Sequence, residues 1–172
     1  LRLAHRYEEA MTVFDTALDI IPGNSDLLYA RALVAERLGR IDQLEEDLKI
    51  ILKTEPDNAH ALNALGFTLA DQTDRFQEAS GYLKRAIEIM PDDPAIIDSL
   101  GWVQYRMGNY EEAERLLRTA LSRFEDAEIA AHLGEVLWVK GKQQEARGIW
   151  QKALEKSPDD PALLKVMQRF IP

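Results

Sequence analysis

The stretch from Pro94 to Leu121, PAIIDSLGWVQYRMGNYEEAERLLRTAL, reads as two amphipathic helices joined by a turn at Gly108-Asn109. Residues spaced three or four apart share one face of a helix. The shared faces are formed by Ile97, Leu100, Gly101 and Gln104 in the first helix and by Ala113, Leu117 and Ala120 in the second. Gly101 and Ala113 are small, so the two backbones can approach closely where they cross. One such hairpin cannot bury its apolar face alone and requires neighbours.

The same hairpin recurs along the chain. Helical runs are followed by Pro22, Pro56, Pro91 and Pro158, with Glu125 where a fifth proline is expected, at intervals of 34, 35, 34 and 33 residues. A fixed period of this length is typical of a stacked repeat array. Capping residues follow each proline break, as in Asp92-Asp93-Pro94, and they mark helix starts. Helices are expected at 7–21, 25–38, 41–54, 59–72, 75–89, 94–107, 110–124, 127–140, 143–156 and 161–170.

Composition excludes several classes of function. The 172 residues carry a net charge of −9, with a sequence pI of about 4.9, which argues against nucleic acid as a ligand. No apolar run reaches the roughly 18 residues of a membrane helix, and the absence of cysteine excludes disulfides and thiolate metal sites. Residues 1–4 read as the last turn of a helix, so the chain is interpreted as a piece of a longer protein.

The repeated residues resemble the tetratricopeptide repeat (TPR) family, whose 34-residue hairpins share a signature of apolar, Leu-Gly, Ala, aromatic, Ala and Pro positions. The best match is the hairpin at 59–91, with Leu62, Leu65, Gly66, Leu69, Phe76, Ala79, Leu83, Ala86 and Pro91. The resemblance implies an all-α fold, a right-handed superhelix of stacked hairpins. The whole of 1–172 is interpreted as one array: a partial repeat at 1–22, repeats at 25–58, 59–91, 94–126 and 127–160, and a capping helix at 161–172.

Two places depart from the signature. In the hairpin at 25–58, Arg31 replaces the usual Leu, Ala32 the usual Gly, and Leu44 and Ile51 the usual Ala pair. Larger residues at an unchanged crossing are unfavourable by about 1–3 kcal/mol, so these helices are expected to separate or tilt. An extra residue within 70–75 is expected to lengthen one turn.

The sequence offers no reaction chemistry. Its histidines are His5, placed in a turn, and His60 and His132, placed in helices, and no two share the spacing of a helical metal pair. Nucleotide-binding loops and nucleophile motifs are missing, and the acidic pairs at 8–9 and 111–112 are interpreted as support for helix N-termini. We expect no enzyme, no cofactor and no metal.

A surface is the functional feature that the sequence offers instead. In the family, a second stripe on the first helix of each hairpin lines a concave groove that holds partner proteins. Aromatic residues recur on this stripe, and Tyr, Trp and Arg often carry interface energy. The alternative is that these rings simply pack between adjacent helices. The predicted groove residues are Tyr29, Leu33, Arg37, Asn63, Phe67, Asp98, Trp102, Tyr105, Arg106, Glu135 and Trp138.

A finer resemblance concerns three stretches, ALNALGFTLADQTDRFQEA at 61–79, PAIIDSLGWVQYRMGNYEEA at 94–113 and EIAAHLGEVLWVKG at 128–141. They are similar to TPR lipoproteins of the Gram-negative outer membrane, some of which are adaptors that bring cell-wall hydrolases to a carboxyl-terminal processing protease. The resemblance implies a periplasmic adaptor, held at the membrane only through a lipid tether outside this sequence; a cytoplasmic location is the alternative. The family's Lys/Asn clamp for chaperone tails is not reproduced. A second hypothesis is an assembly module that self-associates through its end helices and convex faces.

Overall fold

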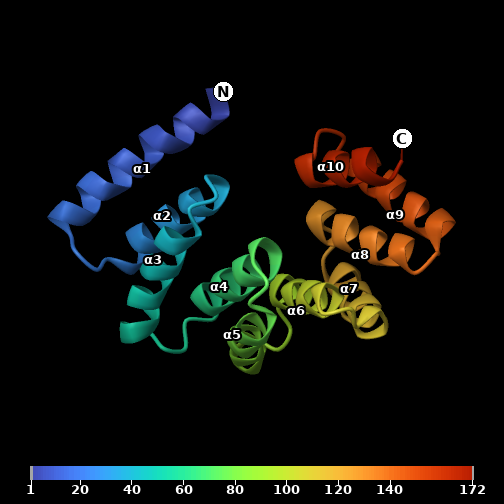
Figure 1. The fold of residues 1–172 in the computed structure, drawn as a ribbon, viewed down its shortest axis with the longest axis horizontal. Coiled ribbons are helices and arrows are strands. Elements are labelled where there is room, and N and C mark those ends of the chain that lie inside the picture. The colour runs from blue at the N-terminus through green and yellow to red at the C-terminus, as the bar shows by residue number, and fades with distance from the viewer. Residues whose placement is uncertain (1, 172) are drawn as a thin grey trace. The chain divides into compact units, whose positions relative to one another are not determined.

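The computed structural model describes residues 2–171, with side chains from residue 5 onward, and within this range it contains ten helices and no strand (Figure 1). The helices are α1 (Arg2–Ile20), α2 (Ser25–Arg37), α3 (Ile41–Thr54), α4 (Ala59–Gln72), α5 (Phe76–Ile89), α6 (Pro94–Arg106), α7 (Tyr110–Arg123), α8 (Ala127–Val139), α9 (Gln143–Lys156) and α10 (Pro161–Phe170).

The helices pack as hairpins within two compact units, Leu1–Ile89 (unit 1) and Met90–Pro172 (unit 2). In unit 1, α2 pairs with α3 and α4 with α5, while α1 packs against α2. In unit 2, α6 pairs with α7 and α8 with α9, and α10 packs against α8 and α9. The hairpin architecture is confirmed, and a single continuous array over 1–172 stays a prediction.

The expected helix bounds agree with the structure to within one residue from α2 to α10. The expectation for the first residues is wrong, because α1 runs without a break from Arg2 to Ile20. His5 therefore lies in a helix and not in a turn, with its Nε2 3.2 Å from Glu9 Oε1. No glycine or proline interrupts this stretch, so nothing in the sequence ends a helix there. Leu1 lies outside the described residues.

Caps and turns explain where the other helices begin and end. Asn24, Asn58, Asp93, Asp126 and Asp160 each accept a hydrogen bond from a backbone N–H in the first turn of the next helix. Within three hairpins, the turn contains a glycine with φ between +69° and +83°, a conformation that favours residues without a Cβ. These glycines are Gly39, Gly108 and Gly141.

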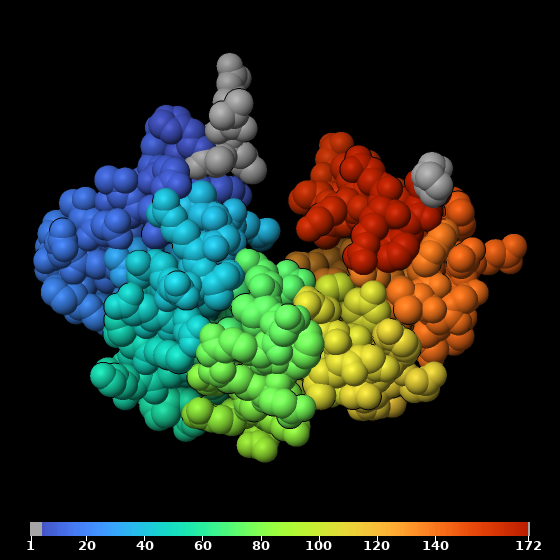
Figure 2. Space-filling model, viewed as in Figure 1, coloured from blue at the N-terminus to red at the C-terminus, as the bar shows by residue number. Residues whose placement is uncertain are grey.

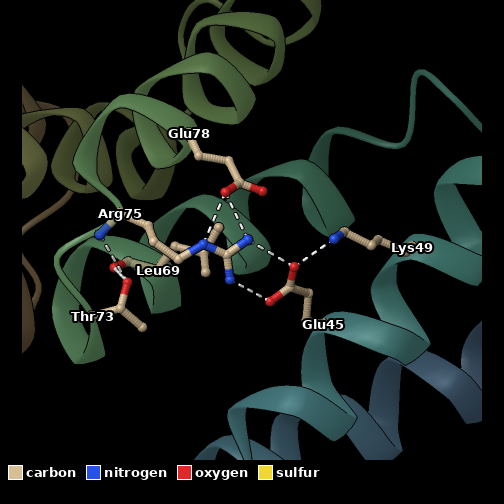
Figure 3. A network of polar contacts seen from close by, with 6 residues as sticks. All are labelled: Glu45, Lys49, Leu69, Thr73, Arg75 and Glu78. Atoms are coloured by element: carbon tan, nitrogen blue, oxygen red, sulfur yellow. Dashed lines mark hydrogen bonds and ion pairs between the residues drawn. The ribbon is translucent and has the colours of Figure 1, made fainter.

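The turn between α4 and α5 is built differently (Figure 3). The extra residue does not lengthen this turn as expected; it extends α4 to 14 residues, against 13 in α2, α6 and α8. Thr73 replaces the glycine, and its Oγ1 donates to Leu69 O and accepts from Arg75 N. Arg75 donates to Glu45 at 2.6 and 2.9 Å and to Glu78 at 2.6 and 2.9 Å. These bonds, together with an ion pair from Lys49, hold the pKa of Glu45 at about 2, against the opposing effect of burial.

The hairpins cross where a glycine meets a large buried side chain. A Cβ on Gly66 or Gly101 would lie 2.6 or 2.7 Å from Leu83 or Leu117 Cγ, and one on Gly134 would lie 2.0 Å from Trp150 Nε1. Trp150 is fully buried, as its signature position predicts, and its Nε1 donates to Ala131 O at 3.3 Å. These glycines are therefore required by the closeness of the packing.

The α2–α3 pair has large residues at its crossing, and Leu44 and Ile51 are fully buried. The pair approaches less closely along its length than α4 and α5 do, but no less closely than α8 and α9, which have the usual glycine and alanines. The expected separation of α2 from α3 therefore stays a prediction. Arg31 is a polar substitute for the usual leucine: its guanidinium donates to Asp47 at 2.7 and 2.9 Å and to Asp15 at 2.7 Å. The hydrogen bonds to buried Asp47 raise the pKa of Arg31. This cluster joins α1, α2 and α3.

α10 covers the end of unit 2. Leu163 and Val166 are buried in the same core as Trp150, and Figure 2 shows the red side chains of α10 against the orange ones of α8 and α9. The opposite, outward face of α10 is mostly polar, with Lys165, Gln168 and Arg169 exposed, although Leu164 is exposed as well. This arrangement suits a terminal helix, which needs one apolar and one polar face.

Candidate protein-binding faces

The predicted groove residues occupy equivalent positions on the first helix of each hairpin. Counted from the crossing residue (Ala32, Gly66, Gly101 or Gly134), all of them lie three positions before it or one, four or five positions after it. Such positions share one side of a helix. They form two separate faces, the α2–α4 face of unit 1 and the α6–α8 face of unit 2.

The α2–α4 face exposes apolar and polar groups together. Leu33 is 39% exposed, Arg37 is exposed, and Tyr29 is half-buried. Burial, and secondarily the nearby carboxylate of Glu36, raises the pKa of the Tyr29 hydroxyl, which is therefore a neutral hydrogen-bond donor at neutral pH. In α4, Phe67 is half-buried.

Asn63 is the most informative residue of this face. Its side-chain oxygen Oδ1 is buried, and among the described residues it is the one such atom that accepts no hydrogen bond. An unpaired buried acceptor is unfavourable by about 1–3 kcal/mol, so it calls for an explanation. A partner's N–H group would satisfy it after a rotation of the Asn63 side chain towards the surface.

α2 and α4 also leave this face more open than its counterpart. Within the described part of unit 1 these two helices approach one another far less than α6 and α8 do in unit 2. Thr68 Oγ1 reaches Glu36 Oε1 at 3.4 Å near one end of the pair.

The α6–α8 face is closed by its own side chains. Asp98 is buried, and both of its carboxylate oxygens lie 3.0 Å from His132 Nδ1. The His132 ring stacks on Trp102 at a centroid distance of 4.2 Å, and Tyr105 lies 5.0 Å from Trp102. Trp102 is consequently only 7% exposed. The expectation of an open row of aromatic rings is therefore wrong at this position.

The network continues to α10. Tyr105 donates its hydroxyl to Glu135 Oε1 at 2.9 Å, and Arg169 Nη1 donates to the same oxygen at 2.8 Å. Burial and the neighbouring carboxylate raise the pKa of Tyr105. Glu135, expected on an open groove, is buried and paired. Arg106, at the end of α6, is half-buried.

Trp138 is partly a surface residue, as the groove prediction expects, and partly packed between helices, as the alternative expects. It is half-buried, and its ring lies 5.7 Å from that of Trp150 and 5.8 Å from that of Phe170. The Arg147 guanidinium lies 5.2 Å over its face. Most of this ring supports the core of unit 2.

Sequence reasoning missed the partners that close the second face. His132 and Arg169 are not among the predicted residues, although each lies 34 residues after its acidic partner, Asp98 or Glu135. Such a pair can be recognised in the sequence by an acidic and a basic residue that lie 34 residues apart, in the first helices of successive repeats. Residues 2–171 contain no group of acidic and histidine side chains arranged to hold a metal ion. No helix among them has the length and apolarity needed to cross a membrane.

The fold places the chain in the class of α-solenoids, which are built from consecutive helical hairpins. A family model described as tetratricopeptide repeat matches residues 29–94 and 99–161. The chain belongs to the tetratricopeptide repeat family, whose members generally mediate protein–protein interaction as non-catalytic scaffolds.

Known proteins resemble the chain over most of its length. It is 49% identical over 128 residues to the TPR repeat-containing protein PA4667 of Pseudomonas aeruginosa, which covers 74% of this chain. It is 25% identical over 166 residues to the human protein O-mannosyl-transferase TMTC1, which covers 92% of it. The chain spans only 22% and 18% of these two proteins. The crystal structure of a thermophilic TPR protein from Thermus thermophilus matches with a TM-score of 0.84 and 27% identity, covering 99% of this chain and 94% of that one.

Proposed function

We propose that the chain is a non-catalytic module that holds a segment of a partner protein on the α2–α4 face. The observation that carries this proposal is the buried, unpaired Oδ1 of Asn63 on the same face as the exposed side chain of Leu33. The first becomes a hydrogen-bond acceptor for a partner's backbone once the Asn63 side chain rotates towards the surface, and the second offers apolar contact. The α6–α8 face, whose polar groups are already paired, supports the fold of unit 2 in this proposal.

The finer proposal concerns the partner and the compartment. We propose that the full-length parent works in the periplasm as a lipid-tethered adaptor that presents cell-wall hydrolases to a carboxyl-terminal processing protease. The resemblance of the 61–79, 94–113 and 128–141 stretches to outer-membrane TPR lipoproteins supports it, as does the 49% identity to a protein of a Gram-negative bacterium. Fractionation of a Gram-negative host that expresses the parent tests the location; recovery in the cytoplasm favours the alternative.

The chain offers a matched pair of leucines for testing the face. Leu33 is 39% exposed on α2, and Leu164 is 41% exposed on α10. Binding of a carboxyl-terminal processing protease and of a cell-wall hydrolase to the immobilised chain is measured by interferometry. Leu33→Asp is expected to weaken binding at least tenfold and Leu164→Asp to leave it unchanged. Equal effects of the two substitutions contradict the proposed face.

Asn63→Ala provides an independent signature. Removal of an unpaired buried acceptor should raise the stability of unit 1 by about 1 kcal/mol, because no hydrogen bond within the chain is lost. The same change should weaken partner binding. A variant that is more stable and binds less tightly marks a residue retained for function, whereas lower stability with unchanged binding marks a structural one.

Self-association is the second candidate function, and exposed residues of α1 favour it. Val13 is 65% exposed and Ile20 is 75% exposed, on a helix whose packing, among the described residues, is mainly against α2. Such a face suits pairing with a second copy. Sedimentation of the chain with and without Val13→Lys tests this: concentration-dependent dimers that the substitution abolishes support an assembly role.

A further inference from the structure

A cavity of about 400 Å³ lies within unit 2, between α7, the start of α8 and α9. Its apolar lining includes Leu121, Ala127, Ala130, Ile149 and Ala153. The cavity shares none of these residues with the α6–α8 face described above. An apolar cavity of roughly 150 Å³ already admits a benzene-sized molecule, so this one has room for a branched side chain.

The cavity has a cause in the sequence. Ala130 stands four residues before the crossing glycine, and the three other hairpins place Leu28, Leu62 and Ile97 at this position. All three larger side chains are buried. Replacement of leucine or isoleucine by alanine in a packed region leaves space that the surroundings only partly fill. The fourth hairpin therefore lacks a side chain that its neighbours contain.

The opposite wall of the cavity carries the usual residue, but this residue is uncovered. Ala153 on α9 is equivalent to Ala86 and Ala120, which are completely buried. Ala153 itself is only partly buried and lines the cavity. Ala130 and Ala153 thus line a space that, in the other hairpins, is occupied by the side chain of Leu28, Leu62 or Ile97.

The rim of the cavity is charged but balanced. Glu125, which replaces the repeated proline, is paired with Lys152 at 2.9 Å and with Lys156, and Arg118 pairs with Glu145 at 2.6 Å. Exposed pairs of this kind contribute little and can rearrange. A rim that carries both acidic and basic groups favours a neutral segment over a free anion or cation, since each added charge would meet a like charge.

We propose that this cavity is an anchor site for one leucine or isoleucine side chain of a partner protein. The inserted side chain takes the place that Leu28, Leu62 and Ile97 occupy in the other hairpins, and the partner's backbone crosses the charged rim. The site belongs to unit 2, so loss of binding at the α2–α4 face would leave it intact.

The test uses small probes of one residue each. N-acetyl-leucine methylamide, N-acetyl-alanine methylamide and octanoate are titrated separately into the isotopically labelled chain, and backbone amide shifts are followed. The leucine probe is expected to produce saturable shifts at Ala127, Ala130 and Ile149, with at least tenfold weaker effects from the alanine probe. Equal responses to both probes, or saturation by octanoate alone, overturn the proposal.

Filling the cavity supplies the control. Ala130→Leu restores the side chain of the other hairpins and should abolish the saturable response to the leucine probe while raising the melting temperature. Ala127→Leu, at the mouth of the cavity, is the second variant if Ala130→Leu does not fold. A response that persists in a folded, filled variant overturns the proposal, because the probe would then bind elsewhere.

Discussion

Substitution of Arg31 should reveal the largest single dependence of unit 1 on one side chain. Arg31 donates three hydrogen bonds of 2.7–2.9 Å, two of them to the fully buried carboxylate of Asp47. Arg31→Leu introduces the residue that the family uses here, so the new side chain has room. What the change removes is the counter-charge of Asp47, which then retains only Gln43 Nε2 at 3.1 Å.

The expected magnitude follows from that unpaired charge. Breaking a buried ion pair on one side is destabilising by about 3–5 kcal/mol. Each kcal/mol shifts the melting temperature of a 60–100-residue unit by roughly 4–8 °C. Arg31→Leu should therefore lower the melting temperature of unit 1 by about 12 °C or more. Since Asp15 remains for Arg31 to contact, Asp47→Leu alone should be the milder change.

The double variant shows how much of the loss comes from leaving the charge of Asp47 buried without a partner. The positions equivalent to Asp47 are Tyr82, Leu116 and Ile149, so a large apolar residue is acceptable there. Replacing both members of a buried ion pair by apolar residues is often neutral or stabilising by about 1–4 kcal/mol. Arg31→Leu with Asp47→Leu should thus recover most of the loss, giving a coupling of roughly 2 kcal/mol or more.

The tryptophans make the assay specific to one unit. Trp102, Trp138 and Trp150 all lie in unit 2, so their fluorescence reports unit 2, while far-ultraviolet circular dichroism reports helices of both units. Urea titrations compare the unsubstituted chain, Arg31→Leu, Asp47→Leu and the double variant. The large shift of Arg31→Leu should appear in the transition followed by circular dichroism. The reasoning is refuted if Arg31→Leu lowers stability by less than about 1 kcal/mol, or if the double variant is as unstable as that single one.

Three further predictions use the same titrations. Gly134→Ala should destabilise unit 2 by about 3 kcal/mol, because the new Cβ would lie 2.0 Å from Trp150 Nε1; an unchanged fluorescence midpoint contradicts this. Gly148→Ala should stabilise unit 2 by about 0.5–1 kcal/mol, since no atom lies within 4 Å of the new Cβ, and a lower midpoint contradicts that. Glu45→Gln should lower stability at pH 7 by about 1 kcal/mol. Arg75 holds the pKa of Glu45 at about 2 instead of 4.5, so this stabilisation is present above pH 4.5 and disappears as the pH falls towards 2. A stability difference that stays constant across this range refutes the role of the Arg75 pair.

The sequence predicts the hairpins well because their determinants are local. Period, capping residue and turn glycine lie within one or two helices of each other, as in Asp93 before α6 and Gly108 after it. The same is true of Trp150, whose signature position alone identifies it as core. The predicted boundary of α1 is wrong where the expected break has no residue to cause it.

The exposure of the face residues cannot be predicted in this way. From the sequence, Arg31 is only a bulky departure, because its partner, Asp47, lies on another helix and matches no signature position. The helical spacing predicts an open Trp102, yet His132, from the next first helix, covers its ring. The helical spacing of residues predicts which side of a helix each residue occupies. Whether that side is exposed depends on how the neighbouring helix packs against it.

One position of the repeat illustrates why function must be located hairpin by hairpin. The residue after each crossing position is Leu33, Phe67, Trp102 or Glu135. The first is exposed, the second half-buried, the third covered by a histidine and the fourth paired with Arg169. The backbone pattern is common to all four, so it cannot by itself mark a binding site. Both proposed sites rest instead on a local departure from the repeat: a buried oxygen without a hydrogen bond at Asn63, and unfilled space beside Ala130.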